Sequence, residues 1–228
     1  MKIKFLLAIL MLSMVSPWLH AQKFFRIKGE FTIKAKAEDG RSQLTMGKFY
    51  YDRNFKKLVY LNHFPKKELW VSKDTSIYHI VDNKILDRQS APPIAEFSMF
   101  NLALNSQLSN YGFKNTAMKI EKVERQNDMV ITTWALPEKA AKLFGKIKTS
   151  TKNNKLIGIV FLDTENKVIK KQFFNEYKNL SGLEFPHEVI DIVYINGKEN
   201  YQVTTYKNIV IDDLTEGNIY NYPIPGGK

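Results

Sequence analysis

The sequence contains no cysteine among its 228 residues. This absence excludes disulfides, thiolate nucleophiles, cysteine metal ligands and a lipid anchor attached to a cysteine thiol. Histidine is scarce as well, and His63, His79 and His187 are too scattered to show the clustered spacing of a metal site. We therefore predict no metal and no cofactor, and stability that comes from the burial of side chains.

Recognisable catalytic motifs are also missing. The chain has no Gly-x-Ser-x-Gly elbow, no phosphate-cradling glycine loop and no His-Glu-x-x-His zinc helix. Acidic residues such as Asp163 and Asp212 fall in turns, so a pair of carboxylates brought together by folding, as in a glycan-cleaving enzyme, stays an alternative. The preferred interpretation is a protein that is not an enzyme and has no catalytic residue.

Acidic residues are too few to balance the basic ones: 34 Lys and Arg face 23 Asp and Glu, a formal net charge of +11. The basic residues are spread thinly, and the tightest clusters are Lys66–Lys67 and Lys170–Lys171 with Lys167 nearby. Such a distribution keeps strand edges and turns soluble, or attracts anionic partners over a long range. It does not form the dense patch of a nucleic-acid-binding protein, so we predict no nucleic-acid partner.

Long hydrophobic runs are absent except near the N-terminus. Lys2 and Lys4 precede the mostly apolar segment 5–15, and Leu19-His20-Ala21 forms an imperfect small-residue cleavage site. This pattern predicts an export signal, residues 1–21, that is cleaved after Ala21. Cleavage would leave 228 − 21 = 207 residues with a charge of 11 − 2 = +9, which suits one domain at 22–228.

The remainder of the chain has the pattern of β-structure. Runs rich in Val, Ile, Thr, Tyr and Phe alternate with turn residues, of which Asp39-Gly40 and Asn196-Gly197 are the clearest hairpin signals. Links of two to five residues favour an antiparallel meander. We expect strands near 24–37, 42–52, 57–64, 67–72, 75–82, 117–125, 128–136, 146–152, 155–163, 166–178, 185–195 and 199–211.

A hydrophobic helix of about four turns is expected between residues 92 and 110, because Pro92-Pro93 can open a helix and apolar residues recur behind them every three or four positions. A shorter helical turn is expected at 137–144. One helix cannot cover both faces of a sheet of some ten strands. We therefore predict a mainly β fold with few helices: a strongly curved antiparallel sheet, or half-open β-barrel, around a hydrophobic cavity with a helical lid.

The segment from Gly47 to Tyr60, followed by Phe64-Pro65 and the strand-like residues 69–78, resembles the bacterial periplasmic lipoprotein carriers of the LolA type. That family shows a glycine, an apolar strand, an Arg-Pro turn, an aromatic strand, a proline, an apolar strand ending in Asp-Gly, and a further strand with an aromatic residue. Here Asn54 replaces the turn proline and Thr75 replaces the glycine. The helix that precedes the first strand in that family is nearly absent.

The resemblance implies a monomeric periplasmic carrier that holds the acyl chains of lipoproteins or other lipids on the way to the outer membrane. Its partners would be an inner-membrane donor and an outer-membrane acceptor protein. One alternative is an envelope-stress sensor or interaction module of the RseB type, which usually has a second domain. Another is a component of a pathway that makes or moves envelope lipids or pigments.

Two sets of residues are candidates for such a site. The resemblance places Arg53 where that family has an arginine that holds the lid closed, and the alternative is a solvated turn arginine. The lid set is Arg53, Phe97, Phe100, Leu104 and Leu108, although a helix packed permanently on the sheet would bury the same residues. The candidate lining of the lipid cavity, which an ordinary packed core would match equally, is Phe49, Tyr51, Val59, Leu61, Trp70, Tyr78, Ile80 and Trp134.

Overall fold

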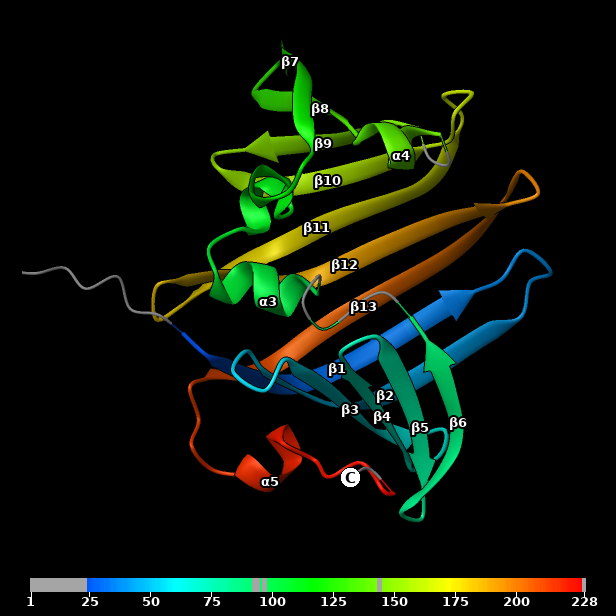
Figure 1. Cartoon of the computed structure of the whole chain (residues 1–228), viewed down its shortest axis with the longest axis vertical. Helices are drawn as coiled ribbons and strands as arrows, with labels where there is room; N and C mark the ends of the chain where they lie inside the picture. Colours follow the sequence, from blue (N-terminus) through cyan, green and yellow to red (C-terminus); the bar gives the residue numbers. More distant parts are fainter. Residues whose placement is uncertain (1–23, 92–94, 96–97, 143–144, 227–228) are drawn as a thin grey trace, which may run out of the picture.

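The computed structural model describes residues 24–91, 95, 98–142 and 145–226 (Figure 1). The predicted export signal at 1–21 lies outside the described residues. So do the double proline expected to open the helix and the predicted lid residue Phe97.

Thirteen strands of the described chain form one antiparallel sheet in the order β6-β5-β4-β3-β2-β1-β13-β12-β11-β10-β9-β8-β7. Two meanders, β1 to β6 and β7 to β13, are joined where β1 pairs with β13. The strands are β1 (Arg26–Lys36), β2 (Ser42–Asp52), β3 (Lys57–Phe64), β4 (Glu68–Lys73), β5 (Ser76–Val81), β6 (Lys84–Ser90), β7 (Lys119–Gln126), β8 (Met129–Ala135), β9 (Ile147–Lys152), β10 (Lys155–Leu162), β11 (Val168–Leu180), β12 (Leu183–Ile195) and β13 (Lys198–Ile211).

The predicted fold class is confirmed: the protein is mainly β, with a curved antiparallel sheet and short helices. The outermost strands, β6 and β7, stand at opposite ends of the strand order, so the described sheet is not closed into a barrel. Figure 1 shows the sheet bending around the short helix α3 (Met99–Leu104), which lies on its concave side.

Both predicted hairpin signals lie in the turns between paired strands. Asn196 and Gly197 are the two residues that link β12 to β13, and both have left-handed backbones with φ of 52° and 78°. Positive φ at both central residues is the requirement of the two-residue turn that matches the twist of a hairpin. Gly40, with φ of 84°, lies in the longer link between β1 and β2.

Strand β6, the edge of the sheet beyond β5, was not predicted from the sequence. All of its seven residues are exposed, so it lacks the alternation of buried and exposed positions that identifies a strand in a sequence. Pairing with β5 through the tight turn at Asp82 and Asn83, both with positive φ, holds it in place.

The predicted helix of about four turns is wrong in its C-terminal part. Helix α3 ends at Leu104, Ser106 has a left-handed backbone with φ of 56°, and Leu108 begins the 3-10 turn η1 (Leu108–Asn110). A second 3-10 turn, η2 (Phe113–Asn115), follows. Apolar spacing alone did not show this break. The short helical turn expected at 137–144 is present as α4 (Glu138–Ala141).

Buried hydrophobic side chains form one cluster on each face of the sheet. On β2, for example, Phe49 and Tyr51 belong to the cluster on the concave face, whereas Tyr50 between them belongs to the convex one. The concave cluster includes the residues of α3. The convex cluster consists of Tyr50, Val59, Leu69, Val71, Ile80 and Tyr220.

The convex cluster is covered by residues 212–226, which we call the C-terminal strap and which include α5 (Gly217–Tyr220). Tyr220 is fully buried, and the guanidinium of Arg26 lies 4.7 Å from the centre of its ring. Lys28 of β1 pairs with Asp213 and Glu216 of the strap. The strap therefore covers the convex cluster, and a pocket of about 390 Å³ lined by Leu61, Ile80 and Tyr222 lies beside it.

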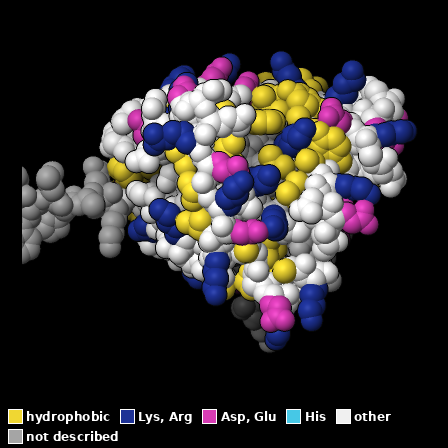
Figure 2. Space-filling view, turned by 90° about the horizontal axis from the view of Figure 1, so that it is seen from above, with side chains coloured by type: hydrophobic (Ala, Val, Ile, Leu, Met, Phe, Trp, Pro, Cys, Tyr) yellow, Lys and Arg dark blue, Asp and Glu magenta, His cyan; other side chains and the backbone are white. Residues whose placement is uncertain are grey.

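Basic side chains are dispersed over the surface. Figure 2 shows lysine and arginine side chains separated by polar and hydrophobic ones on the face seen from above in Figure 1. On the edge strand β7, Ile120 and Val123 are half exposed. In the described part of the chain, no helix is long and apolar enough to cross a membrane.

Candidate functional site: a cavity in the concave face

The concave face contains a cavity of about 480 Å³ between α3 and the sheet. This volume lies within the range of about 300–1,000 Å³ that is typical of small-molecule sites. The cavity is lined by Phe31, Ile33, Thr45, Leu58, Tyr60, Asn62, Trp70, Ser72, Ile77, Ser98, Met99, Phe100, Tyr111, Gln172, Val189, Asp191, Gln202, Thr204 and Tyr206.

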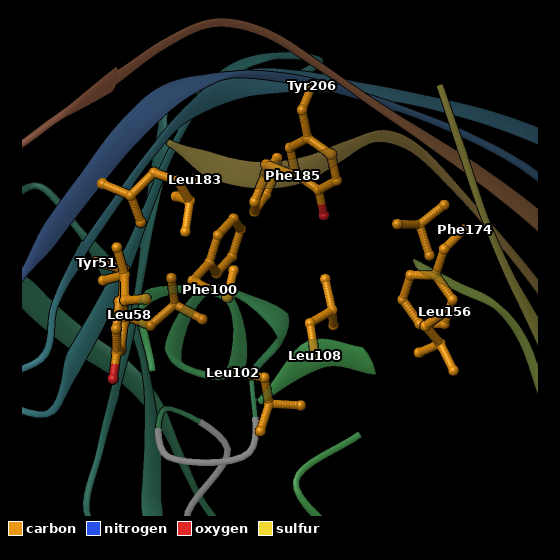
Figure 3. Packing of buried hydrophobic residues seen from close by; sticks show 14 of the residues in the cluster. Tyr51, Leu58, Phe100, Leu102, Leu108, Leu156, Phe174, Leu183, Phe185 and Tyr206 are labelled. Carbon is orange, nitrogen blue, oxygen red and sulfur yellow. The ribbon is translucent and has the colours of Figure 1, made fainter. Parts of the chain in front are cut away.

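Phe100 of α3 forms the boundary between this cavity and the solid core. Its ring stacks on Phe49 at 4.5 Å between centroids, and it meets Tyr206 edge-on at 5.7 Å. Figure 3 shows Phe100 between Leu58 and Tyr51 on one side and Phe185 and Tyr206 on the other. The helix thus fills the middle of the concave face with its own apolar side chains.

Polar side chains attach α3 to β2 and the turn after it. Tyr51 donates a hydrogen bond from its hydroxyl to Oδ1 of Asn101 at 2.8 Å, and Arg53 Nη1 donates to Oδ1 of Asn105 at 3.0 Å. Asn105, at the end of the helix, also donates from Nδ2 to Oδ1 of Asn101 at 2.8 Å. Ser98 caps the other end by accepting from the backbone N–H of Asn101. These are bonds to neutral partners, which can be exchanged for bonds to water.

A second cavity, of about 630 Å³, lies at the other end of α3. It opens beside the β9–β10 and β11–β12 turns and reaches Ala103 of the helix and Leu108 of η1. Its wall includes the polar turn residues Asn153, Asn154 and Ser181. Helix α3 therefore has one cavity on each side, and its buried residues occupy the space between them.

The hydroxyls of Tyr60 and Tyr206 are hydrogen-bonded to each other inside the concave face. Burial raises the pKa of both tyrosines above the ordinary value, and it raises the pKa of Tyr111 to about 12. All three phenols are consequently neutral at physiological pH. Asp191 is the one charged residue among those that line the 480 Å³ cavity.

The structure divides the predicted lining residues between the two faces of the sheet. Trp70 lines the 480 Å³ cavity, and the other concave members are packed in the core: Phe49 and Tyr51 against Phe100, and Trp134 farther along. The Trp134 ring meets Phe113 edge-on at 5.5 Å, and its Nε1 donates to Thr149 at 2.9 Å. The remaining four residues lie on the convex side, where Val59 and Ile80 are buried, Tyr78 packs against them and Leu61 lines a shallow pocket.

The described lid residues are brought together at α3. Phe100, Leu104 and Leu108 are all buried in the concave cluster, and Arg53 reaches the end of the helix through Asn105. They lie where a lid would lie, and their contacts equally suit a helix that stays in place.

Several cavity residues were not identified from the sequence. On β3 the residues that face the cavity are Leu58 and Tyr60, one position away from the predicted Val59 and Leu61. A signal was available, because Trp70 is opposite Tyr60 in the β3–β4 pair and directly opposite residues share a face. The polar residues Asp191 and Gln202 carried no such signal.

Searches for similar proteins gave matches in structure alone. No protein-family model and no curated protein sequence matches the chain. A LolA superfamily protein from Nitrosomonas europaea is 11% identical, with a TM-score of 0.60 over 87% of this chain and 91% of that one. A putative outer membrane lipoprotein-sorting protein domain from Vibrio parahaemolyticus is 12% identical, with a TM-score of 0.62 over 86% and 89%.

A DUF1329 family protein from Desulfovibrio piger is 13% identical, with a TM-score of 0.60 and 97% of each chain covered. At these identities the likeness concerns the fold and not the activity. The resemblance first noticed in residues 47–80 is thus confirmed at the level of structure. The chain has a fold similar to that of LolA superfamily proteins and lipoprotein-sorting domains.

Proposed function

We propose that this protein is a non-enzymatic, exported carrier that shelters the acyl chains of a lipoprotein or another lipid in the concave face of its sheet. The observation that carries the proposal is the 480 Å³ cavity whose apolar wall continues beneath the short helix α3. The export signal expected at 1–21 and the fold shared with lipoprotein-sorting domains support the same role.

Burial of a hydrocarbon chain supplies ample free energy for such a carrier. Each methylene removed from water contributes about 0.8 kcal/mol, so a chain of about 14 carbons contributes on the order of 10 kcal/mol before the costs of binding are subtracted. The cavity wall offers Leu58, Trp70 and Ile77 from the sheet and Met99 from α3 as contacts for that chain.

Helix α3 acts as the lid in this proposal. In the empty protein Phe100 and its neighbours occupy the groove, and movement of α3 away from the sheet would join the two cavities on either side of it. The helix has six residues and is attached to the sheet through Asn101 and Asn105, and its movement would also uncover the buried side chain of Phe100. Arg53, at the helix end, would set how firmly the lid is held.

The test is lipid binding by the purified mature protein. The protein would be extracted with organic solvent and the extract analysed by mass spectrometry, and the lipid-free protein would be titrated with an acylated peptide. Retention of a co-purified lipid or saturable binding of the peptide at one site is the expected result. Failure to retain or bind any lipid rejects the proposal.

A further inference from the structure

One transverse row of the concave wall is polar, whereas the next row inward, formed by Phe174, Val189 and Thr204, is mostly apolar. Gln172, Asp191 and Gln202 are directly opposite one another on β11, β12 and β13. Gln172 donates from Nε2 to Asp191 Oδ1 at 3.1 Å, and Tyr111 donates its hydroxyl to Gln172 Oε1 at 3.3 Å. Each of these four residues lines the 480 Å³ cavity, so the row is part of its wall.

The wall changes in character along the strands. Nearest to α3, Phe185 and Tyr206 pack on Phe100. Asp191 of the polar row lies six residues beyond Phe185 on β12, and Gln202 lies four residues from Tyr206 on β13. Figure 1 shows the hairpin ends of β12–β13 and β1–β2 projecting beyond α3, so the row lies between the helix and the open end of the groove.

A basic side chain follows immediately outside the polar row. A smaller cavity of about 350 Å³ shares Asp191 and Gln202 with the first one, and its wall also includes Lys170. Lys170 Nζ lies 2.8 Å from Asp191 Oδ1, and its side chain is 38% exposed. From α3 outward, the groove therefore offers a mostly apolar wall, then a carboxylate acceptor with amides, then the ammonium group of Lys170.

This sequence of layers defines the polar end of a ligand. A carboxylate is only an acceptor, so the group that rests on Asp191 must be a donor such as a hydroxyl or an amide N–H. Asp191 already accepts from Gln172 and Lys170, so a donor of the ligand would take one of the remaining acceptor sites of this carboxylate. Hydrogen bonds to charged groups are stronger than those between neutral ones. Lys170 at this carboxylate would attract a negative charge.

We propose that the cavity selects amphiphiles that carry a hydrogen-bond donor directly beyond the acyl chain and an anionic group one step farther out. This inference rests on the proposed carrier function and adds the chemistry of the cargo to it. Two sources share that chemistry: a monoacyl glycerophospholipid, through its free glycerol hydroxyl and phosphate, and an acylated acidic peptide, through its amide N–H and carboxylate.

The experiment uses displacement of diphenylhexatriene, a hydrocarbon fluorophore without polar groups, from the purified mature protein. Palmitoyl lysophosphatidic acid is compared with its 2-O-methyl ether, which has the same chain and phosphate but lacks the hydroxyl donor. N-palmitoyl-glycylglycine is the peptide arm. We expect lysophosphatidic acid to bind about tenfold more tightly than its ether, and Asp191→Asn to abolish this preference.

Two further variants distinguish the contribution of Lys170 from that of Asp191. Lys170→Met should weaken the binding of both phosphate ligands while it leaves the preference for the hydroxyl in place. Asp128→Asn is the matched control, because Asp128 also pairs with a lysine, Lys152, but lies in the β7–β8 turn. It should change neither quantity. If the peptide alone binds with dependence on Asp191, the cargo is an acylated peptide rather than a glycerophospholipid.

The carrier function and the role of the polar row are rejected by different results. Absence of saturable diphenylhexatriene binding would reject the carrier function itself. Saturable binding without any preference for donor-bearing ligands, or a preference that persists in Asp191→Asn, would overturn the inference about the polar row and leave the carrier function intact.

Discussion

Arg53, in the turn after β2, donates a hydrogen bond from Nη1 to Oδ1 of Asn105, the residue that ends α3, at a distance of 3.0 Å. This contact joins the one arginine that the family resemblance singled out to the one helix that covers the cavity. Asn105 in turn donates to Asn101, which accepts from Tyr51. A substitution of Arg53 therefore affects the hydrogen bonds that hold both Asn105 and Asn101 of the helix.

Arg53→Leu should alter the release of lipid more than it alters stability. The lost hydrogen bond is partly exposed, so the free energy of unfolding should fall by no more than about 1.5 kcal/mol. The rate at which bound lipid passes to acceptor vesicles should change severalfold, because the end of α3 is freed. Urea denaturation and a fluorescence transfer assay measure the two quantities.

The control for that variant is Arg41→Leu, since Arg41 lies in the β1–β2 turn and pairs with Asp39 at 2.6 Å far from the helix. It should leave lipid transfer unchanged. Equal effects of Arg53→Leu on stability and on transfer would count against a role of Arg53 in holding the lid.

Phe100→Ala should make lipid binding tighter while it makes the empty protein less stable. Truncation of a buried phenylalanine typically costs about 3–5 kcal/mol. If lipid displaces α3, this packing is already lost in the complex, so the variant destabilises the empty form more than the bound form and the affinity rises by linkage. Denaturation with and without ligand, together with a binding titration, measures both effects.

Tyr220→Ala removes an equally buried ring from the convex face and serves as the comparison. It should reduce stability without a gain in affinity. A loss of affinity in Phe100→Ala would show that the phenylalanine contacts the lipid instead of standing in its place.

The two faces of β3 and β4 should respond differently to truncation. Tyr60→Leu and Trp70→Leu change the wall of the cavity and should weaken lipid binding severalfold. Val59→Ala removes two methyl groups from the convex cluster, which costs stability of about 2 kcal/mol and leaves binding unchanged. Fluorescence titration of the three variants separates the faces. Weaker binding in Val59→Ala alone would place the lipid on the opposite side of the sheet.

The C-terminal strap should loosen in acid. Lys28 holds the pKa of Asp213 at about 2 through a hydrogen bond, and Thr215 contributes two more. A depressed carboxyl pKa adds stability above the ordinary value of 3.8, and this contribution is lost as the pH falls toward about 2. The difference in urea midpoint between the native protein and Asp213→Asn should therefore be constant near neutral pH and close between about pH 4 and 2.

Lys28 stays protonated at neutral pH, so its own titration does not weaken the attachment of the strap there. Burial lowers its pKa, but the hydrogen bonds to Asp213 and Glu216 more than offset that effect, so the pKa is raised overall. A midpoint difference that persists unchanged to pH 2 would show that the Lys28–Asp213 pair does not hold the strap.

The neighbours within each meander followed from the sequence, because short links allow only antiparallel neighbours. The pairing of β1 with β13, which joins the two meanders, is not specified by any short link. The sequence did not reveal β6, since an edge strand exposed at every residue has no alternation to detect. The break after Leu104 was also hidden, because Leu104 and Leu108 keep helical spacing while Ser106 between them takes a left-handed backbone. Local backbone geometry of this kind has no hydrophobic signature.

The cavity was harder to predict than the fold. Strands buried on both faces, such as β2 with Phe49, Tyr50 and Tyr51, give no alternation from which the inner face can be read. Only the cross-strand partner shows which residues face the cavity, as Trp70 does for Tyr60. The polar row depends on the register of three long strands at once, which a single sequence does not specify.

Photo-crosslinking tests the central claim most directly. A palmitic acid with a diazirine near the end of its chain would be bound to the mature protein, illuminated, and the modified residues identified by peptide mass spectrometry. We expect adducts on the concave wall, at residues such as Leu58, Trp70 and Met99, with at most one molecule of the fatty acid attached to each protein molecule. Adducts confined to the convex side around Leu61 and Ile80, or none above the level of denatured protein, would contradict it.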